Sequence, residues 1–171
     1  MRLFVAVWPS EEVLERIAAL PRPDVRGLRW TTPEQWHVTL RFFGEADVDE
    51  AVAVFRRIDV ESTGDAVAQL GPATGRFGQR VLHVPVEGLE ALARATVRAT
   101  ERLGKPPDRR PFSGHVTLAR SRTRGVDLRP LAGQALAGRW PVGELTLVCS
   151  RLGAGEGRAA RYEVVERLAL A

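Results

Sequence analysis

The four residues His-Val-Thr-Leu occur twice in this chain, at 37–40 and at 115–118, although the chain contains only three histidines. Both copies lie in runs of β-forming residues, so each copy predicts a strand. Alternate side chains of a strand share a face, which places the histidine and threonine on one face and the valine and leucine on the other. The apolar pair is expected to pack into a core and the polar pair to face a cleft.

The rest of the chain alternates between short predicted strands and amphipathic helices. Strands are expected at 2–8, 36–45, 66–88 (two strands broken by glycines), 114–120, 140–153 and 160–170. Helices are expected after Ser10, at 48–58 after Asp47, and at 89–104. Glycine-rich turns join several strands, the last pair included, which favours antiparallel sheets over parallel βαβ units. The loosely repeated order of elements indicates an internal duplication around the two motif copies.

The basic residues of the chain are almost all arginine, with Lys105 the only lysine, and the formal net charge is +4. A genome rich in G and C would produce this bias and is the favoured explanation. An arginine-rich surface also suits phosphate, because the guanidinium fork matches two phosphate oxygens. A basic balance by itself is only a weak indication of nucleic acid.

The remaining composition points to a cytoplasmic protein. The first apolar run covers only residues 3–8, which predicts no signal peptide, and no run approaches the roughly 18 residues of a membrane helix. Cys149 is the only cysteine, so the chain forms no internal disulfide and no multi-cysteine metal site. It lies in an alternating run and is interpreted as a small buried side chain.

Two strands of this kind, placed side by side about a rough two-fold axis, bring two imidazoles and two hydroxyls together. Displacement at phosphorus requires such an arrangement: one imidazole takes a proton from water and the other gives a proton to the leaving oxygen. Hydroxyls can donate to the oxygens that gather negative charge. No metal is needed, and the densest acidic cluster, 47–50, is better explained by helix capping.

Other residues near the motifs have simpler interpretations. His83, which lacks a following threonine, is expected to be an ordinary strand residue. Strict alternation places Arg41 on the face opposite Phe42, at the surface. For Phe42 itself, a core position and an exposed position remain alternatives.

Two such motifs about eighty residues apart resemble the signature of the 2H phosphoesterases, and within them the bacterial RNA 2′,3′-cyclic phosphodiesterases, also called 2′-5′ RNA ligases. The resemblance extends to four segments and nearly the whole chain: 2–13, 28–45, 110–120 and 145–170. One departure is Gly114, where the family often has proline before the histidine; glycine leaves this segment freer.

The resemblance implies an α+β, bilobal fold with two antiparallel sheets, outer helices, a central cleft and a pseudo-two-fold axis, all within one domain, 1–171. It implies metal-free hydrolysis of a 2′,3′-cyclic phosphate to a 2′-phosphate, with reversible 2′-5′ RNA ligation as a side activity. His37 would be the acid and His115 the base. The implied phosphate contacts come from three side chains: Thr39, Thr117 and Arg120. Phe42 would offer a face to a nucleobase, whereas the simpler alternative for Arg120 is a solvated strand end.

The expected partner is RNA that ends in a 2′,3′-cyclic phosphate, such as tRNA fragments, bound by a monomer without cofactor or membrane. Two alternatives stay open: a 2H enzyme for a small cyclic nucleotide phosphate, and a non-catalytic RNA-binding module of the same fold. Salt dependence of binding separates RNA from a small nucleotide, because additional phosphate contacts steepen it. Intact copies of both histidines and both threonines argue against the binding module.

Overall fold

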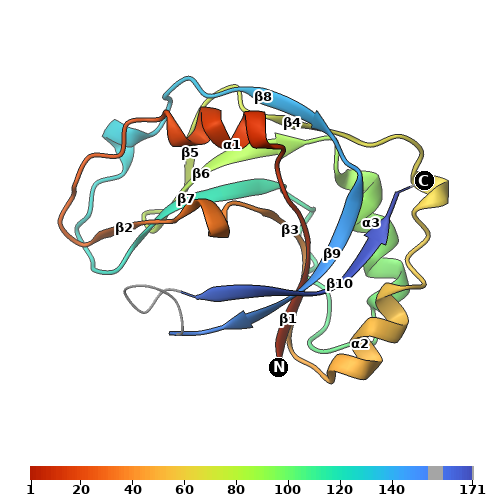
Figure 1. Cartoon of the computed structure of the whole chain (residues 1–171). Helices are drawn as coiled ribbons and strands as arrows, with labels where there is room; N and C mark the ends of the chain where they lie inside the picture. The colour runs from red at the N-terminus through yellow and green to blue at the C-terminus, as the bar shows by residue number, and fades with distance from the viewer. Residues whose placement is uncertain (154–159, 171) are drawn as a thin grey trace.

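A computed structural model describes residues 1–153 and 160–170 (Figure 1). The strands are β1 (Arg2–Val7), β2 (Leu28–Trp30), β3 (Val38–Glu45), β4 (Val67–Leu70), β5 (Gly75–Phe77), β6 (Val81–Glu87), β7 (His115–Ser121), β8 (Gly138–Pro141), β9 (Glu144–Arg151) and β10 (Arg161–Ala169). The helices are α1 (Glu11–Ala18), α2 (Val48–Phe55) and α3 (Glu90–Thr100), with 3₁₀ turns η1 (Pro33–Gln35), η2 (Glu61–Thr63) and η3 (Arg129–Leu131). Most of the glycine-rich turn expected before the last strand falls at 154–159, outside the described residues.

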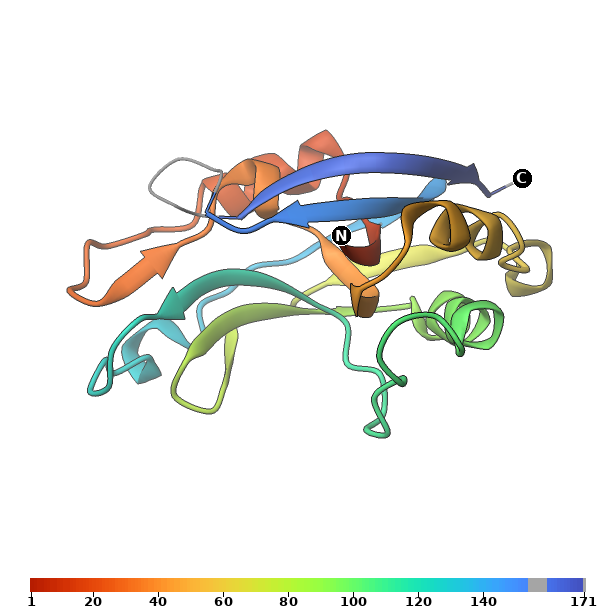
Figure 2. The same cartoon turned by 90° about the horizontal axis from the view of Figure 1, so that it is seen from below.

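The described strands pair in the order β10-β9-β1-β3-β7-β6-β4-β8, with β2 added to β7 and β5 added to β6. The named strand pairs are antiparallel. Figure 2 shows the halves as curved layers, with β9 and β10 in one, β6 and β7 in the other, and α2 and α3 at the same end. The predicted α+β fold with antiparallel sheets is therefore confirmed.

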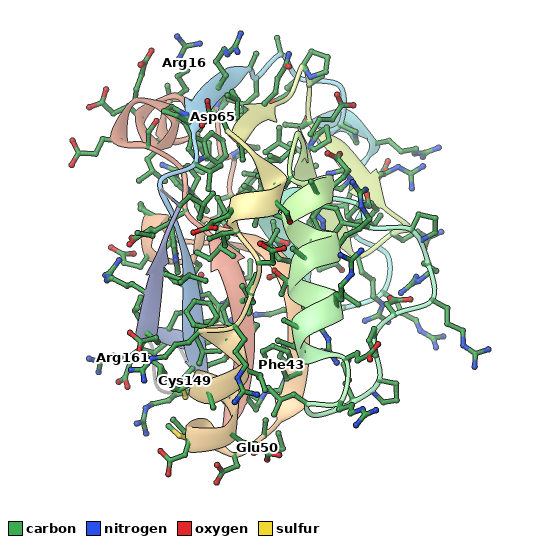
Figure 3. The ribbon with its side chains drawn as sticks, turned by 90° about the vertical axis from the view of Figure 1, so that its right-hand side faces the viewer. Arg16, Phe43, Glu50, Asp65, Cys149 and Arg161 are labelled. Carbon is green, nitrogen blue, oxygen red and sulfur yellow. The ribbon has the colours of Figure 1, made fainter. Side chains whose placement is uncertain are left out.

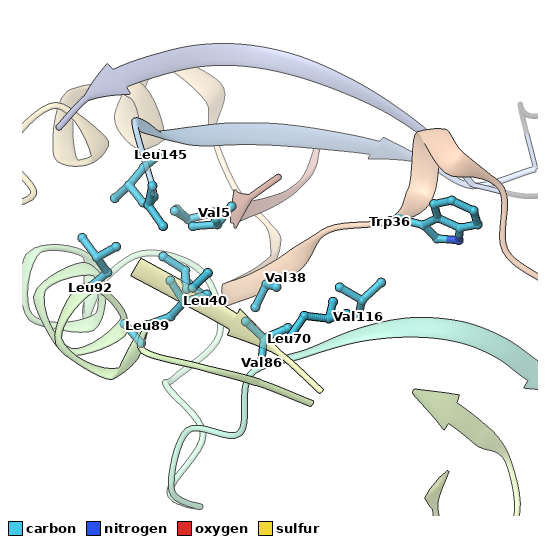
Figure 4. Packing of buried hydrophobic residues seen from close by; sticks show 14 of the residues in the cluster. Val5, Trp36, Val38, Leu40, Leu70, Val86, Leu89, Leu92, Val116 and Leu145 are labelled. Carbon is cyan, nitrogen blue, oxygen red and sulfur yellow. The ribbon is translucent and has the colours of Figure 1, made fainter. Parts of the chain in front are cut away.

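The two halves meet where β3 pairs with β7 through Val38 and Val116. Each of these valines is the second residue of its motif copy. Because the strands run antiparallel, a local two-fold axis passes between the two valines and relates one copy to the other. Val38 and Val116 are both fully buried, and Figure 4 shows them with Leu40 among the apolar side chains of the core. The predicted inward face of each motif is confirmed.

Each motif strand carries a β-bulge immediately after its threonine. In β3, Thr39 and Arg41 oppose consecutive residues of β1, so Leu40 is an extra residue. In β7, Thr117 and Ala119 oppose consecutive residues of β6 in the same way. A bulge shifts the alternation of the following side chains by one position. The third residue after each threonine, Phe42 or Arg120, consequently returns to the face that carries the threonine.

The bulge also explains why the surface position predicted for Arg41 is wrong: this side chain is only 5% exposed. Its guanidinium donates hydrogen bonds to the carbonyl and hydroxyl oxygens of Thr100, at the end of α3. It also donates to the carbonyls of Leu103 at 3.0 Å and Lys105 at 2.9 Å. A cation at this place satisfies carbonyls that a helix end leaves without partners. Arg41 thereby connects the end of α3 to β3, the first motif strand, by hydrogen bonds.

Several local predictions hold, and others are wrong at element ends. Ser10 and Asp47 cap α1 and α2, as predicted, and Cys149 is buried. Figure 3 shows charged side chains such as Arg16 and Glu50 at the periphery. The helix predicted at 48–58 ends at Phe55, and that at 89–104 spans Glu90–Thr100. The region 66–88 forms three strands, and β2 was not predicted. The run 140–153 covers the end of β8, which begins at Gly138, and all of β9.

No helix within 1–153 or 160–170 is long and apolar enough to cross a membrane.

Candidate active site

A cavity of about 610 Å³ opens between the two halves of the fold. All six side chains proposed from sequence line it: His37, Thr39, Phe42, His115, Thr117 and Arg120. The strands β3 and β7 present them, because alternation exposes histidine and threonine and the bulge exposes the third residue beyond. Sequence reasoning missed further lining side chains, which come from other strands, from η1 and from the residues directly after β2 and β9: Arg2, Phe4, Arg29, Thr31, Gln35, Ser150, Leu152 and Tyr162.

The register between the motif strands determines how the histidines face each other. Val38 pairs with Val116, so His37 precedes one valine and His115 precedes the other on antiparallel strands. In a regular ladder such residues are diagonal neighbours on one face, about 7–8 Å apart. Each histidine is then opposite the threonine of the other copy. Two imidazoles and two hydroxyls thus lie around the same part of the cavity.

Backbone carbonyls determine which ring nitrogen of each histidine carries a proton. Nδ1 of His37 lies 2.8 Å from the carbonyl oxygen of Gln35, and Nδ1 of His115 lies 2.9 Å from that of Ser113. A carbonyl can only accept, so Nδ1 is the donor in both rings. In each neutral ring Nε2 is then the basic atom. Nε2 of His37 accepts from the Thr39 hydroxyl at 3.0 Å.

The two imidazoles have different surroundings. His37 is enclosed by aromatic rings, with centroid distances of 4.9 Å to Phe4, 5.3 Å to Trp8 and 5.0 Å to Tyr162. Burial lowers the pKa of His37 to about 4, and the positive charges of His115 and Arg120 act in the same direction.

His115 is less enclosed and lies in the second half of the fold. Its ring is 4.7 Å from Phe77 and 5.6 Å from His83. Burial also lowers the pKa of His115, and Arg120 adds to this effect. His83 is a buried strand residue, as expected, but its contact with His115 was not predicted.

Three arginines make the cavity suitable for an anion: Arg2, Arg29 and Arg120. Arg29 lies opposite Arg120 where β2 pairs with β7, so the two side chains share a region of the sheet. Guanidinium groups bind phosphate oxygens in a bidentate manner. Nothing in the local sequence identified Arg29, because the three-residue strand that carries it has no clear pattern of its own.

Phe42 is half-buried, and two cations lie over its ring. The guanidinium carbon of Arg2 is 5.0 Å from the ring centroid and Nζ of Lys105 is 4.8 Å away. A nucleobase that stacks on Phe42 must therefore share the ring with these cations or displace them.

Gly114, where the chain departs from the family pattern, is closely packed against β6. Its carbonyl accepts a hydrogen bond from the Val86 N–H at 2.8 Å. A Cβ atom at this position would lie 2.5 Å from the Val86 carbonyl oxygen. The segment before His115 is thus held by the neighbouring strand, and the freedom expected from glycine is not seen.

Across 1–153 and 160–170, no group of three or more His, Cys, Asp or Glu side chains is placed to hold a metal ion. Asp47 accepts a hydrogen bond from the Glu50 N–H at 2.9 Å, which agrees with its predicted role as a helix cap.

Comparisons with known proteins agree with this geometry. A family model described as LigT-like phosphoesterase matches residues 7–70. The RNA 2′,3′-cyclic phosphodiesterase of Thermus thermophilus is 31% identical over an alignment 193 positions long, which covers 99% of this chain and 90% of that protein. The Bacillus subtilis protein of the same name is 28% identical, and the match covers 62% of each chain.

Solved structures show the same fold. The crystal structure of a Thermus thermophilus protein superposes with a TM-score of 0.80 at 30% identity, and covers 99% of this chain and 98% of that one. Escherichia coli LigT in complex with 3′-AMP superposes with a TM-score of 0.74 at 26% identity, covering 99% and 97%. The fold and the comparisons define a 2H phosphoesterase. Within this class, the chain belongs to the LigT-like phosphoesterase family.

Proposed function

We propose that this protein hydrolyses the 2′,3′-cyclic phosphate at an RNA end to a 2′-phosphate by two-histidine acid–base catalysis without a metal. The observation that carries the proposal is that the two histidines and the two threonines of the motif copies line one cavity about a local two-fold axis. Residues 1–171 act as one domain with two lobes, because both halves supply lining side chains. That it works in the cytoplasm as a monomer stays a prediction.

The reaction is a displacement at phosphorus. Nε2 of His115 takes a proton from water, whose oxygen attacks phosphorus opposite O3′. The P–O3′ bond breaks as Nε2 of His37 gives its proton to O3′, which leaves a free 3′-hydroxyl and a 2′-phosphate. Thr39 and Thr117 donate hydrogen bonds to the non-bridging oxygens, where charge gathers, and Arg120 binds one of them. A 5′-hydroxyl in place of water gives a 2′-5′ linkage, and the reaction is reversible.

The direct test is incubation of an oligonucleotide ending in a 2′,3′-cyclic phosphate with the protein in EDTA. We expect complete conversion to the 2′-phosphate, which is identified by its phosphorus NMR signal. A 3′-phosphate product would mean that O2′ leaves instead. Loss of activity in the chelator, with recovery on addition of a metal, would contradict the metal-free reaction.

The acid and base can be told apart through the leaving group. Burial lowers the pKa of His37 to about 4 and also lowers that of His115. A bound phosphate must raise the pKa of His37 if this residue is the acid. A substrate with sulfur in place of the bridging O3′ needs no proton on departure. We expect this substrate to restore turnover by His37→Ala and not by His115→Ala; the opposite pattern would exchange the two roles.

The pH dependence of kcat/KM follows from the lowered pKa values. The reaction needs one neutral and one protonated imidazole, so the profile is bell-shaped. Burial lowers the pKa of His37 to about 4 and that of His115 below its usual 6.5. We therefore expect the maximum of kcat/KM below pH 6.5, with a fall at higher pH as the acid loses its proton. The kcat profile should lie at higher pH, because bound phosphate favours both cations. A flat kcat/KM profile from pH 5 to 9 would contradict paired catalysis.

Gly114→Ala tests how closely His115 must be held. The new Cβ would meet the Val86 carbonyl oxygen at 2.5 Å, so the strand must shift next to the histidine. A displacement of about 1 Å can cost about 100-fold in rate, and we expect kcat to fall by about this factor. Gly143→Ala is the matched control, because nothing lies within 4 Å of its Cβ position. Equal kcat values for the two variants would show that the packing at Gly114 is unimportant for catalysis.

A further inference from the structure

The aromatic ring of Phe77, at the end of β5, is unusually exposed for its type. It is 40% exposed, and among the described residues it is the one aromatic side chain in the group of exposed large hydrophobics. Phe77 does not line the catalytic cavity, yet its ring lies 4.7 Å from His115 in an edge-on arrangement. The exposed ring is thus next to the cavity, on the His115 side.

A second ring holds Phe77 in place from behind. His83 stacks on Phe77 with a centroid distance of 3.8 Å and an interplanar angle of 22°. His83 is itself 8% exposed, and Gly75 leaves room for it, since a Cβ there would come within 3.3 Å of the imidazole. Burial and the charge of His115 lower the pKa of His83 to about 4, so this ring is neutral near pH 7. One face of Phe77 is covered, and the exposed area belongs to the other face and the edges.

The surroundings of Phe77 suit a nucleic acid strand. Phe77 pairs with Val81, Val81 pairs with Arg120, and Arg120 pairs with Arg29, in one row across four strands. The aromatic ring at one end of this row can stack on the base of one nucleotide, and the guanidinium groups at the other end can bind the reacting phosphate of the next nucleotide. The ring of Phe42, in contrast, already has two cations over it. Among the described residues, no arginine or lysine is found over the ring of Phe77.

We propose that Phe77, supported by His83, is a stacking platform for the nucleobase 5′ to the reacting nucleotide, so that the natural substrate is single-stranded RNA of at least two nucleotides. This inference rests on the proposed function, because the reacting phosphate must lie between the two histidines. The cavity then holds the terminal nucleotide, and the chain of the RNA leaves past His115. Stacking on an aromatic ring tolerates any base, so little sequence preference is expected at this position.

The test compares a mononucleotide 2′,3′-cyclic phosphate with a dinucleotide that carries the same end. We expect the wild type to show a KM about 5- to 100-fold lower for the dinucleotide, as one stacked base provides. Phe77→Leu should abolish this difference, whereas Phe77→Tyr should keep it. A dinucleotide that is abasic at the 5′ position should behave like the mononucleotide in the wild type and be insensitive to Phe77→Leu.

Each failure has a distinct signature. If Phe77→Leu lowers kcat for both substrates and leaves the ratio of KM values unchanged, Phe77 only supports His115 and the platform is refuted. Equal KM values for both substrates in the wild type also refute it. To separate this from the proposed function, a 2′-phosphorylated product with 2-aminopurine at the 5′ position is bound to the protein. Quenching of the 2-aminopurine fluorescence on binding, if Phe77→Leu removes it, supports the stacking platform. This holds even if the protein hydrolyses neither cyclic phosphate. Absence of hydrolysis together with such quenching would refute only the proposed reaction.

Discussion

Replacement of His37 or His115 by alanine is expected to lower kcat for cyclic phosphate hydrolysis by about 10²- to 10⁴-fold each. In the proposed displacement each imidazole moves one proton, and a carbonyl accepts from its Nδ1, which leaves Nε2 for the proton transfer. Single-turnover rates on an oligonucleotide with a 2′,3′-cyclic phosphate measure the effect without interference from product release.

The control for the histidine variants is Arg94→Ala, because Arg94 is exposed on α3, away from the cavity. It should retain the wild-type rate, and all variants should keep the wild-type circular dichroism spectrum. A histidine variant that folds normally and turns over at more than a tenth of the wild-type rate would remove that residue from the proposed chemistry.

Arg41→Met is expected to lower the free energy of unfolding by about 2–4 kcal/mol, because each buried acceptor that loses its donor costs about 1–3 kcal/mol. The variant removes the donors to Thr100, Leu103 and Lys105, although the Thr100 carbonyl keeps a hydrogen bond from the Leu103 N–H. Urea denaturation followed by circular dichroism gives the change, provided that the slope with urea stays constant.

Arg94→Met is the matched control for this measurement too, since an exposed substitution usually changes stability by less than about 0.5 kcal/mol. Arg41→Lys keeps the positive charge but loses the planar guanidinium group with its several donors, so an intermediate loss in the free energy of unfolding is expected. A loss of less than about 1 kcal/mol for Arg41→Met would mean that water or another donor satisfies the end of α3.

Much of the fold could be predicted because its determinants are local. Alternation in the two motif copies identified the buried valines and the polar face, and side chains at 10 and 47 identified two helix starts. The β-bulges could not be predicted, because an extra residue is defined only against a neighbouring strand. This is why Arg41 was placed at the surface. The strand β2 was missed for a related reason: three residues form it only by pairing with β7.

The same distinction applies to the residues of the candidate site: some follow from local alternation, and others depend on how distant strands pair. His37, Thr39, His115 and Thr117 follow from alternation, and Phe42 and Arg120 reach the cavity only through the bulges. The family resemblance supplied these two, since strict alternation from the threonine would place the third residue on the opposite face. Arg2, Arg29 and Phe77 belong to strands whose neighbours are set by long-range pairing. No local pattern marks them.

The convergence of both imidazoles on one phosphate can be tested most directly by nitrogen-15 NMR of the three histidine rings, with and without the 2′-phosphorylated product. We expect the pKa values of His37 and His115 to rise together when the phosphate binds, while each Nδ1 stays protonated and Nε2 titrates. His83, which lies outside the cavity lining, is the internal reference and should move least. A phosphate that raises the pKa of only one of the two rings, or of neither, would contradict a site in which both hold the same phosphorus centre.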